Sequence, residues 1–502
     1  MSKLTYRKTA KRLNISARLP VIQRRVVDLN SSERNLVKAV ASEILGESRN
    51  HAELSYFQPQ VQQGLGDTSY IFFGDIREIR LFGNRNASPI EYRLSVLAGE
   101  GDLVVIGGKQ NRDFEQYLEK ELSLGRREYL YTGVSDDDGT VPTLLRCLND
   151  INIYAQLRTK VEERGGATLV AHISTGTVWA LARKLGRDTG LPIHVAGPRP
   201  SLTVQANDKL WFASLTTRLF GKSSVPLTYS VFGKAALAGR VHSLARDFEK
   251  VVIKIPDSAG SVGNFPILSA DIAGMSVKKL YRFLDEMIAD VVGSAPYPMM
   301  AQVWKRDVLT SPSIQLWIPL PGDGPPVIEG IFEQNITGQS GRFSGAILAS
   351  LPDDWDSRLS RDALMLGCVL QALGYFGRCS FDTVISGENF GSASLHWIEC
   401  NGRWGGVSVP MSLMNRLFAP DKTPAYIISH SNVQFPLQSQ SSTSLDIFAD
   451  KLWHPDAVSG IVFISPITFD EGNALIFLSL AARTKDALNQ ADTVFQRLAE
   501  IT

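Results

Sequence analysis

Short apolar runs alternate with amphipathic segments in the part of the chain that begins at residue 102. The apolar runs, which predict buried strands, lie at 103–106, 129–131, 168–171 and 192–195. The segments between them, at 114–122, 141–149 and 177–187, have the periodicity of helices. Strands that alternate with helices favour a parallel sheet. We therefore predict a Rossmann-like α/β domain over residues 99–206.

The first 98 residues show no such regularity and are interpreted as an N-terminal extension. Asn30 and Glu33 have the spacing of a capping box, which predicts that an amphipathic helix begins there. Two apolar runs, 70–73 and 79–82, are strand-like.

Residues 207–420 have a mixed pattern that predicts an α+β domain. Asn207 or Asp208 is positioned to cap a helix. Predicted strands at 225–231, 251–256, 313–318 and 327–334 are interspersed with predicted helices at 234–248, 276–292 and 357–373. Residues 421–502 predict a smaller α+β region, with strands at 460–464 and 474–478 and a helix at 484–499.

Composition narrows the class of protein. The chain has 502 residues, which suggests roughly two to four domains. Its hydrophobic content of 44% and formal net charge of +1 are typical of globular proteins and argue against nucleic acid or a membrane as a partner. Four cysteines without metal-ligand spacing, and no secretory or membrane-spanning segment, predict a cytoplasmic protein. A homo-oligomer is left open.

Residues 1–40 are basic, with ten Lys or Arg against two acidic residues. Such an arm could contact an acidic partner, but a solvated extension is the better prediction.

The candidate chemistry lies in two apolar stretches, 374–385 and 395–406, joined by a polar loop that predicts a hairpin. Side chains alternate along a strand, so Glu399 and Asn401 share a face, and Asp382 joins them if the strands pair. Two carboxylates and an amide oxygen suit Mg²⁺, with Mn²⁺ as an alternative. Arg403 follows, where a cation can stabilise phosphate charge. The alternative is a hairpin with a solvated polar face.

A second candidate element begins at Lys254, a lysine in an apolar strand. The loop after it is rich in small residues, and its amides could surround phosphates; its candidate contacts are Ser258, Gly260, Ser261 and Gly263. A Walker loop at 220–223 is rejected because position 216 is Thr. A hydrolase nucleophile elbow at 259–263 is disfavoured because Pro266 prevents the helix that should follow.

The Gly374-Tyr-x-Gly377 start, the aspartate at 382 and the Glu399-x-Asn401-x-Arg403 end resemble the ATP-grasp superfamily. One departure is Cys379-Ser380-Phe381, where the family more often has an aliphatic residue or Arg beside the aspartate. The resemblance implies two α+β subdomains that clasp ATP.

By the same resemblance, Lys209 and Lys254 would contact the nucleotide phosphates. Residues 300–304 resemble the adenine-binding hinge, with Gln302 and Trp304 beside the base. A core strand with a surface Gln explains that stretch nearly as well. Within the superfamily, residues 100–420 look most like pheganomycin-type peptide ligases, which carry a pre-ATP-grasp domain; the region 421–502 would be a small α+β appendage.

The function implied by this resemblance is ATP-dependent ligation of a carboxylate and an amine through an acyl phosphate, with release of ADP and phosphate. Lys254 and Arg403 would be catalytic, and ATP and Mg²⁺ the cofactors. The acid would be an amino acid or a related acid, and the amine an amino acid or peptide. The alternatives are a ligase for a non-peptide acid or amine, and a catalytically silent ATP-binding regulatory protein.

Overall fold

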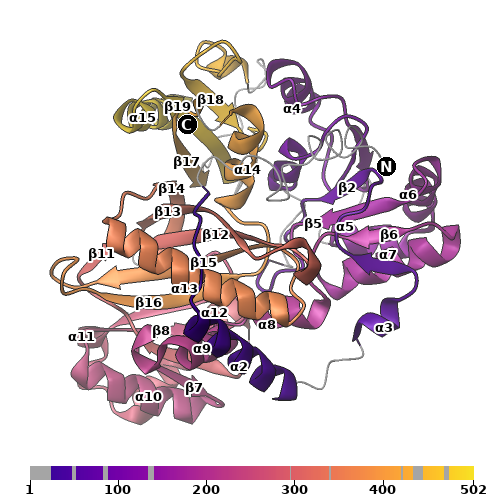
Figure 1. Cartoon of the computed structure of the whole chain (residues 1–502). Coiled ribbons are helices and arrows are strands. Elements are labelled where there is room, and N and C mark those ends of the chain that lie inside the picture. The colour runs from indigo at the N-terminus through magenta and orange to yellow at the C-terminus, as the bar shows by residue number, and fades with distance from the viewer. Residues whose placement is uncertain are drawn as a thin grey trace.

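The computed structural model describes residues 24–47, 53–82, 89–133, 141–293, 296–338, 341–419, 422–432, 445–467 and 474–501. Three sheets organise this part of the chain, and Figure 1 shows the N-terminal parallel sheet beside two antiparallel ones. The basic arm predicted over residues 1–40 lies outside the described residues up to position 23.

The parallel sheet has six strands in the order β1-β6-β5-β2-β3-β4. Its strands are β1 (Val61–Gln63), β2 (Tyr70–Phe73), β3 (Leu103–Ile106), β4 (Glu128–Tyr131), β5 (Ala167–Ala171) and β6 (Ile193–Val195). The helices associated with it are α3 (Glu53–Phe57), η1 (Pro89–Val96), α4 (Arg112–Gln116), η2 (Tyr117–Glu121), α5 (Thr143–Asn149), α6 (Ile151–Glu163) and α7 (Gly176–Thr189). The predicted α/β domain is confirmed.

The parallel sheet includes strands that precede residue 99, the predicted start of the α/β domain. β2 lies between β5 and β3 in the sheet, although residues 1–98 were interpreted as a separate extension. All four residues of β2 are buried, because a central strand of a parallel sheet is covered on both faces. The prediction of a strand at 79–82 is wrong; these residues form turns.

The small antiparallel sheet carries one wall of the candidate site. Its order is β7-β10-β8-β9, from β7 (Thr228–Val231), β8 (Lys250–Lys254), β9 (Asn264–Leu268) and β10 (Met299–Val303). Helices α10 (Lys234–Asp247), α11 (Ser269–Ile272) and α12 (Val277–Val292) pack with it into one core. The η3 turn (Lys222–Ser224) precedes β7.

The large sheet has nine strands in the order β11-β15-β12-β13-β14-β17-β19-β18, with β16 paired to β15. They are β11 (Val308–Thr310), β12 (Pro312–Ile318), β13 (Val327–Thr337), β14 (Arg342–Leu348), β15 (Gly377–Ser386), β16 (Ser394–Asn401), β17 (Ala425–Asn432), β18 (Gly460–Phe463) and β19 (Ala474–Ala481). β17 pairs with both β14 and β19, so the C-terminal region continues this sheet instead of forming a detached appendage.

The helices around this sheet are α2 (Ser31–Glu47), α8 (Pro200–Asn207), α9 (Lys209–Phe220), α13 (Asp353–Ala372), α14 (Ser408–Leu417) and α15 (Thr484–Ile501), with short turns η4 (Pro321–Asp323) and η6 (Asp446–Phe448). The capping box is confirmed at the start of α2: the Glu33 N–H donates to the Asn30 side chain at 3.0 Å, and the Asn30 N–H to Glu33 at 2.7 Å. α2 packs on α13 across the sheet from the parallel domain (Figure 1).

No helix among the described residues combines the length and the apolar character needed to cross a membrane.

Candidate active site

The predicted hairpin exists and brings the three candidate metal ligands together. β15 and β16 pair antiparallel, with Asp382 opposite Glu399 and Ser380 opposite Asn401. Asp382, Glu399 and Asn401 line one cavity. Cys400, between the two β16 ligands, is buried in the core on the other face. The alternation of faces inferred from the sequence is therefore confirmed.

Asp382 is held by two hydrogen bonds. The hydroxyl of Ser313 donates to its Oδ1 at 2.6 Å, and the amide nitrogen of Asn401 donates to its Oδ2 at 2.9 Å. Burial, together with the charge of Glu399, raises the pKa of Asp382 to about 7. The carboxyl is thus poised to exchange a proton for a cation near neutral pH.

Glu399 lies in a different electrostatic environment. Its Oε2 is 3.0 Å from Nζ of Lys209. Burial by itself would raise the pKa of Glu399, but Lys209, Arg403 and Lys254 outweigh it and lower the pKa. The two facing carboxyls therefore differ: the pKa of Glu399 is lowered, whereas Asp382 takes up a proton near neutral pH.

The donor set fits a hard divalent cation, because two carboxylates and an amide supply only oxygen. In the structure, the Asn401 oxygen accepts from Arg403 while its nitrogen faces Asp382. Turning the amide over would present the oxygen beside Asp382. Within the described residues, no three His, Cys, Asp or Glu side chains gather into a site of their own. A cation here would therefore take further ligands from a nucleotide and from water.

Two lysines extend the positive charge of the site. Lys209 opens α9, whose N-cap Asp208 accepts from the N–H of Leu210 at 2.7 Å, and its Nζ donates to the Ser258 carbonyl at 2.6 Å. Lys254 ends β8 and is 7% exposed. Burial lowers its pKa to about 8, against the opposing attraction of Glu399.

Of the four residues predicted to contact phosphates in the loop after β8, two line the cavity and two do not. Gly260 and Ser261 line the cavity, both with left-handed backbone (φ 60° and 62°), and the Ser261 hydroxyl donates to the Gly341 carbonyl at 2.9 Å. Ser258 and Gly263 do not line it. They close the loop on itself, because a Cβ at position 263 would lie 2.3 Å from the Ser258 hydroxyl oxygen.

The predicted adenine hinge also borders the cavity, through Gln302 and Trp304. The Gln302 amide nitrogen donates to the Thr228 hydroxyl at 2.7 Å, so this side chain is turned toward β7. The Lys250 ammonium lies 4.1 Å from the centre of the Trp304 ring. The predicted hinge therefore borders the cavity, but the amide nitrogen of Gln302 is hydrogen-bonded to Thr228.

The cavity has a volume of about 950 Å³, at the upper end of the range for small-molecule sites. The site residues that the sequence analysis did not name include Arg93, His172, Ser311, Ser313, Glu333, Gln334 and His430. His172 directly follows β5, and ligands of parallel sheets bind at the carboxyl ends of strands, so that rule could have indicated it. Arg93 lies in η1, an irregular helix for which no pattern was recognised.

Comparison with known proteins defines the class of fold. Residues 91–187 match the family model of the pre ATP-grasp domain. This match, the parallel sheet and the paired antiparallel sheets show a pre-ATP-grasp domain followed by an ATP-grasp fold, as the sequence predicted. A comparison with curated protein sequences gives no match.

Among solved structures, the chain is similar to biotin carboxylase from Campylobacter jejuni in a β-γ-ATP complex, with 13% identity, a TM-score of 0.52, and coverage of 84% of this chain and 90% of that one. It is similar to the biotin carboxylase domain of 2-oxoglutarate carboxylase from Hydrogenobacter thermophilus, in complex with MgADP, ADP and bicarbonate. The identity is 12% and the TM-score 0.50, and the match covers 85% of this chain and 89% of that one. It is also similar to an N5-carboxyaminoimidazole ribonucleotide synthetase in complex with ADP. Here the identity is 9% and the TM-score 0.50, and the match covers 86% of this chain and 96% of that one. At these identities the likeness establishes the fold.

Proposed function

We propose that the protein is an ATP-dependent carboxylate–amine ligase that uses Mg²⁺ and releases ADP and phosphate. The observation that carries the proposal is the convergence, in one cavity, of Asp382, Glu399 and Asn401 with the cations Lys209, Lys254 and Arg403. Three of the solved structures with a TM-score of at least 0.50 support it, because they are complexes with β-γ-ATP, with MgADP and with ADP.

The chain's own groups suit the problem that such a reaction poses. A carboxylate and a triphosphate repel one another, so the site must supply positive charge before they can approach. Mg²⁺, held by Asp382, Glu399 and Asn401, would supply part of that charge. Lys209 and Lys254 reach the cavity from α9 and β8, and Arg403 reaches it from the end of β16.

The reaction follows from these roles. The γ-phosphoryl group of ATP passes to the carboxylate oxygen of the acid, which gives an acyl phosphate and ADP. The amine then attacks the carbonyl carbon, the C–N bond forms, and phosphate leaves with the bonding electron pair. The loop that carries Gly260 and Ser261 lines the cavity, and its role in this proposal is to exclude water that would hydrolyse the acyl phosphate.

The deciding experiment measures ADP release with Mg·ATP and a panel of acids and amines. The acids include amino acids, simple carboxylic acids and bicarbonate, and hydroxylamine replaces the amine in parallel reactions because it traps an acyl phosphate as a hydroxamate. Hydroxamate formation that depends on both acid and ATP supports the proposal. Tight binding of a non-hydrolysable ATP analogue, with no acid-dependent ADP release, would instead identify a silent nucleotide-binding protein.

Two variants make this test specific to the site. Glu399→Gln should lower acid-dependent ADP release by on the order of 100- to 1,000-fold. Glu388→Gln is the matched control, because Glu388 lies exposed in the loop of the same hairpin. If the two variants lose activity equally, the reaction does not take place at the site described here.

A further inference from the structure

The cavity continues beyond the metal site into a wall built by the pre-ATP-grasp domain. Six of its lining residues come from this domain: Ile76, Ile79, Phe82, Ile90, Arg93 and His172. Four of them are apolar, one is a cation and one is a histidine. No acidic side chain from this domain lines the cavity in the described part of the chain.

Arg93 is 6% exposed, which is unusual for a guanidinium without a carboxylate. Its NH2 group lies 2.8 and 2.6 Å from the two ring nitrogens of His172. Its Nε is buried and has no hydrogen-bond partner among the described residues. Burial, with the nearby charge of Arg403, lowers the pKa of Arg93 to about 9.

His172 does not compensate this charge. Burial, Arg93 and Arg403 hold the pKa of its ring well below the usual value, so the ring is neutral and brings no negative charge to Arg93. Two other buried arginines behave differently: Arg77 pairs with Asp75 and Glu91, and Arg378 pairs with Glu329. A buried, uncompensated guanidinium that faces a cavity is therefore a site for an anion from outside.

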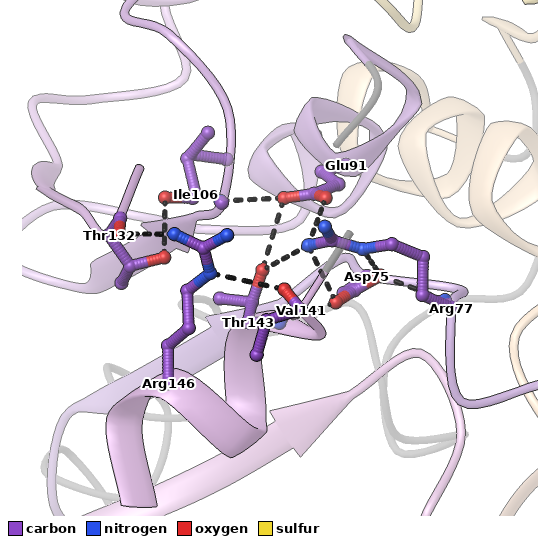
Figure 2. A network of polar contacts seen from close by, with 9 residues as sticks. Asp75, Arg77, Glu91, Ile106, Thr132, Val141, Thr143 and Arg146 are labelled. Atoms are coloured by element: carbon purple, nitrogen blue, oxygen red, sulfur yellow. Dashed lines mark hydrogen bonds and ion pairs between the residues drawn. The ribbon is translucent and has the colours of Figure 1, made fainter. Parts of the chain in front are cut away.

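A polar network at the carboxyl edge of the parallel sheet includes Glu91, which lies in η1 like Arg93 (Figure 2). The Arg77 guanidinium bridges Asp75 at 2.9 Å and Glu91 at 3.0 Å, and Glu91 also accepts from the Gly107 N–H at 2.6 Å. Glu91 precedes Arg93 by two residues in η1, so the network anchors this irregular helix. The guanidinium of Arg93 is thereby held at the cavity wall.

The same end of the cavity adjoins the reacting groups. The N–H of Trp404, the residue after Arg403, donates to the His172 carbonyl at 3.0 Å. This bond joins the end of β16 to the end of β5, and Arg403 is close enough to Arg93 for its charge to lower the pKa of Arg93. An anion bound at Arg93 would thus lie next to Arg403, at the end of the metal hairpin.

We propose that Arg93 binds the carboxylate of the acid substrate, and that this acid has an apolar body and no free α-ammonium group. The apolar body would pack on the isoleucines of the same wall, where none of the described residues offers a carboxylate to pair with an ammonium group. This inference rests on the proposed ligase function and narrows its substrate class to simple hydrocarbon acids or N-acylated amino acids.

The test uses hydroxylamine as the amine, because it carries no carboxylate of its own. Hexanoate, benzoate and N-acetylphenylalanine are compared with free phenylalanine, and hydroxamate and ADP are both measured. We expect the wild type to use at least one of the first three acids with a higher kcat/KM than phenylalanine. In Arg93→Met the KM for that acid should rise on the order of 10- to 100-fold, since a charged hydrogen bond is lost. The KM for ATP should not change.

Two further variants separate binding from folding. Arg93→Lys keeps the charge and should recover part of the affinity for the acid. Arg416→Met is the matched control, because Arg416 is a partly buried arginine that donates to the carbonyls of Val96, Ala98 and Leu124 and does not line the cavity. It should lower stability and leave the KM for the acid unchanged.

Three results would overturn the inference. An unchanged KM for the acid in Arg93→Met, with a raised KM for an amino-acid amine in place of hydroxylamine, would assign Arg93 to the amine's carboxylate. Preference for free phenylalanine over its N-acetyl derivative would reject the substrate class. Wild-type protein that makes no hydroxamate from any acid, bicarbonate included, would remove the proposed function itself, and with it this inference.

Discussion

The side chains of Lys209 and Glu399 form an ion pair, with 3.0 Å between Nζ and Oε2, that joins the first turn of α9 to β16. The pair keeps Glu399 ionised even though the carboxyl is recessed in the cavity. It therefore prepares one ligand for a cation, while the facing Asp382 retains its proton until the cation arrives. The predictions below follow from this asymmetry and from the cations around it.

Glu399→Gln should lower turnover by on the order of 100- to 1,000-fold and move the Mg²⁺ dependence to higher concentration. The substitution keeps the shape of the side chain but removes the charge that faces the cations. Cys400→Ala should instead lower the free energy of unfolding by about 1 to 2 kcal/mol, because Cys400 packs in the core. ADP release at varied Mg²⁺, with melting temperatures, measures both effects. A solvated hairpin would show the opposite ranking.

The affinity for Mg²⁺ in the presence of an ATP analogue should rise with pH and level off above about pH 7. Asp382 has a pKa of about 7, raised by burial and by Glu399, so below this pH a cation must displace its proton. Calorimetric titrations between pH 5.5 and 8.5 measure the dependence. Asp382→Asn should bind Mg²⁺ weakly and with a flatter pH profile; a profile identical to that of the wild type would assign the titration to another group.

The metal-free protein should lose stability as the pH rises toward 7. The folded-state pKa of Asp382, about 7, exceeds the ordinary aspartate pKa of 3.8, so between these pH values the folded protein binds more protons than the unfolded chain. The stability present at low pH is therefore lost as the pH passes through about 7, by on the order of 2 to 4 kcal/mol from this group. Urea unfolding in EDTA gives the free energy of unfolding at each of several pH values. This free energy should depend less on pH in Asp382→Asn than in the wild type.

Lys254→Met should weaken the binding of an ATP analogue and yet stabilise the nucleotide-free protein. Burial lowers the pKa of Lys254 from 10.5 to about 8, so at pH 7 the folded protein bears the cost of a buried charge. That cost, on the order of 1 to 3 kcal/mol, declines as the pH rises from about 8 to 10.5 and is absent in the variant. Calorimetry and thermal unfolding measure the two effects. Equal affinity for the analogue in wild type and variant would end the assignment of Lys254 to the triphosphate.

The loop that carries Gly260 and Ser261 should exchange its amide hydrogens more slowly when an ATP analogue is bound. The Ser261 hydroxyl donates to the Gly341 carbonyl and Lys209 donates to the Ser258 carbonyl of this loop, and phosphates would give its amides further partners. Ser261→Ala removes the hydroxyl bond and should speed exchange in the free protein. Equal protection with and without the analogue would show that the loop does not contact the nucleotide.

Much of the fold and half of the site could be predicted because the signals are local. The alternation along β16 orients Glu399 and Asn401 away from Cys400 whatever surrounds the strand. The capping box at Asn30 and Glu33 acts within a single helical turn. Lys254, at the end of β8, could be recognised as a candidate because a buried strand rarely contains a lysine.

Other features depend on contacts between distant segments, which no local pattern encodes. β2 belongs to the centre of the parallel sheet only because it pairs with β3 and β5. Ser258 and Gly263 were predicted as phosphate contacts, but they pack against each other and do not line the cavity. Their neighbours Gly260 and Ser261 line it instead.

By itself, the sequence determined how the side chains alternate along β16, where α2 begins, and that Asp382, Glu399 and Asn401 belong to one hairpin. These follow from steric and hydrogen-bonding preferences that operate over a few residues. The tertiary structure alone decided that Lys209 meets Glu399 and that Arg93 reaches the cavity with no carboxylate partner among the described residues. Charges that are far apart along the chain perturb one another only after folding removes the water between them, because burial lowers the local dielectric and strengthens their interaction.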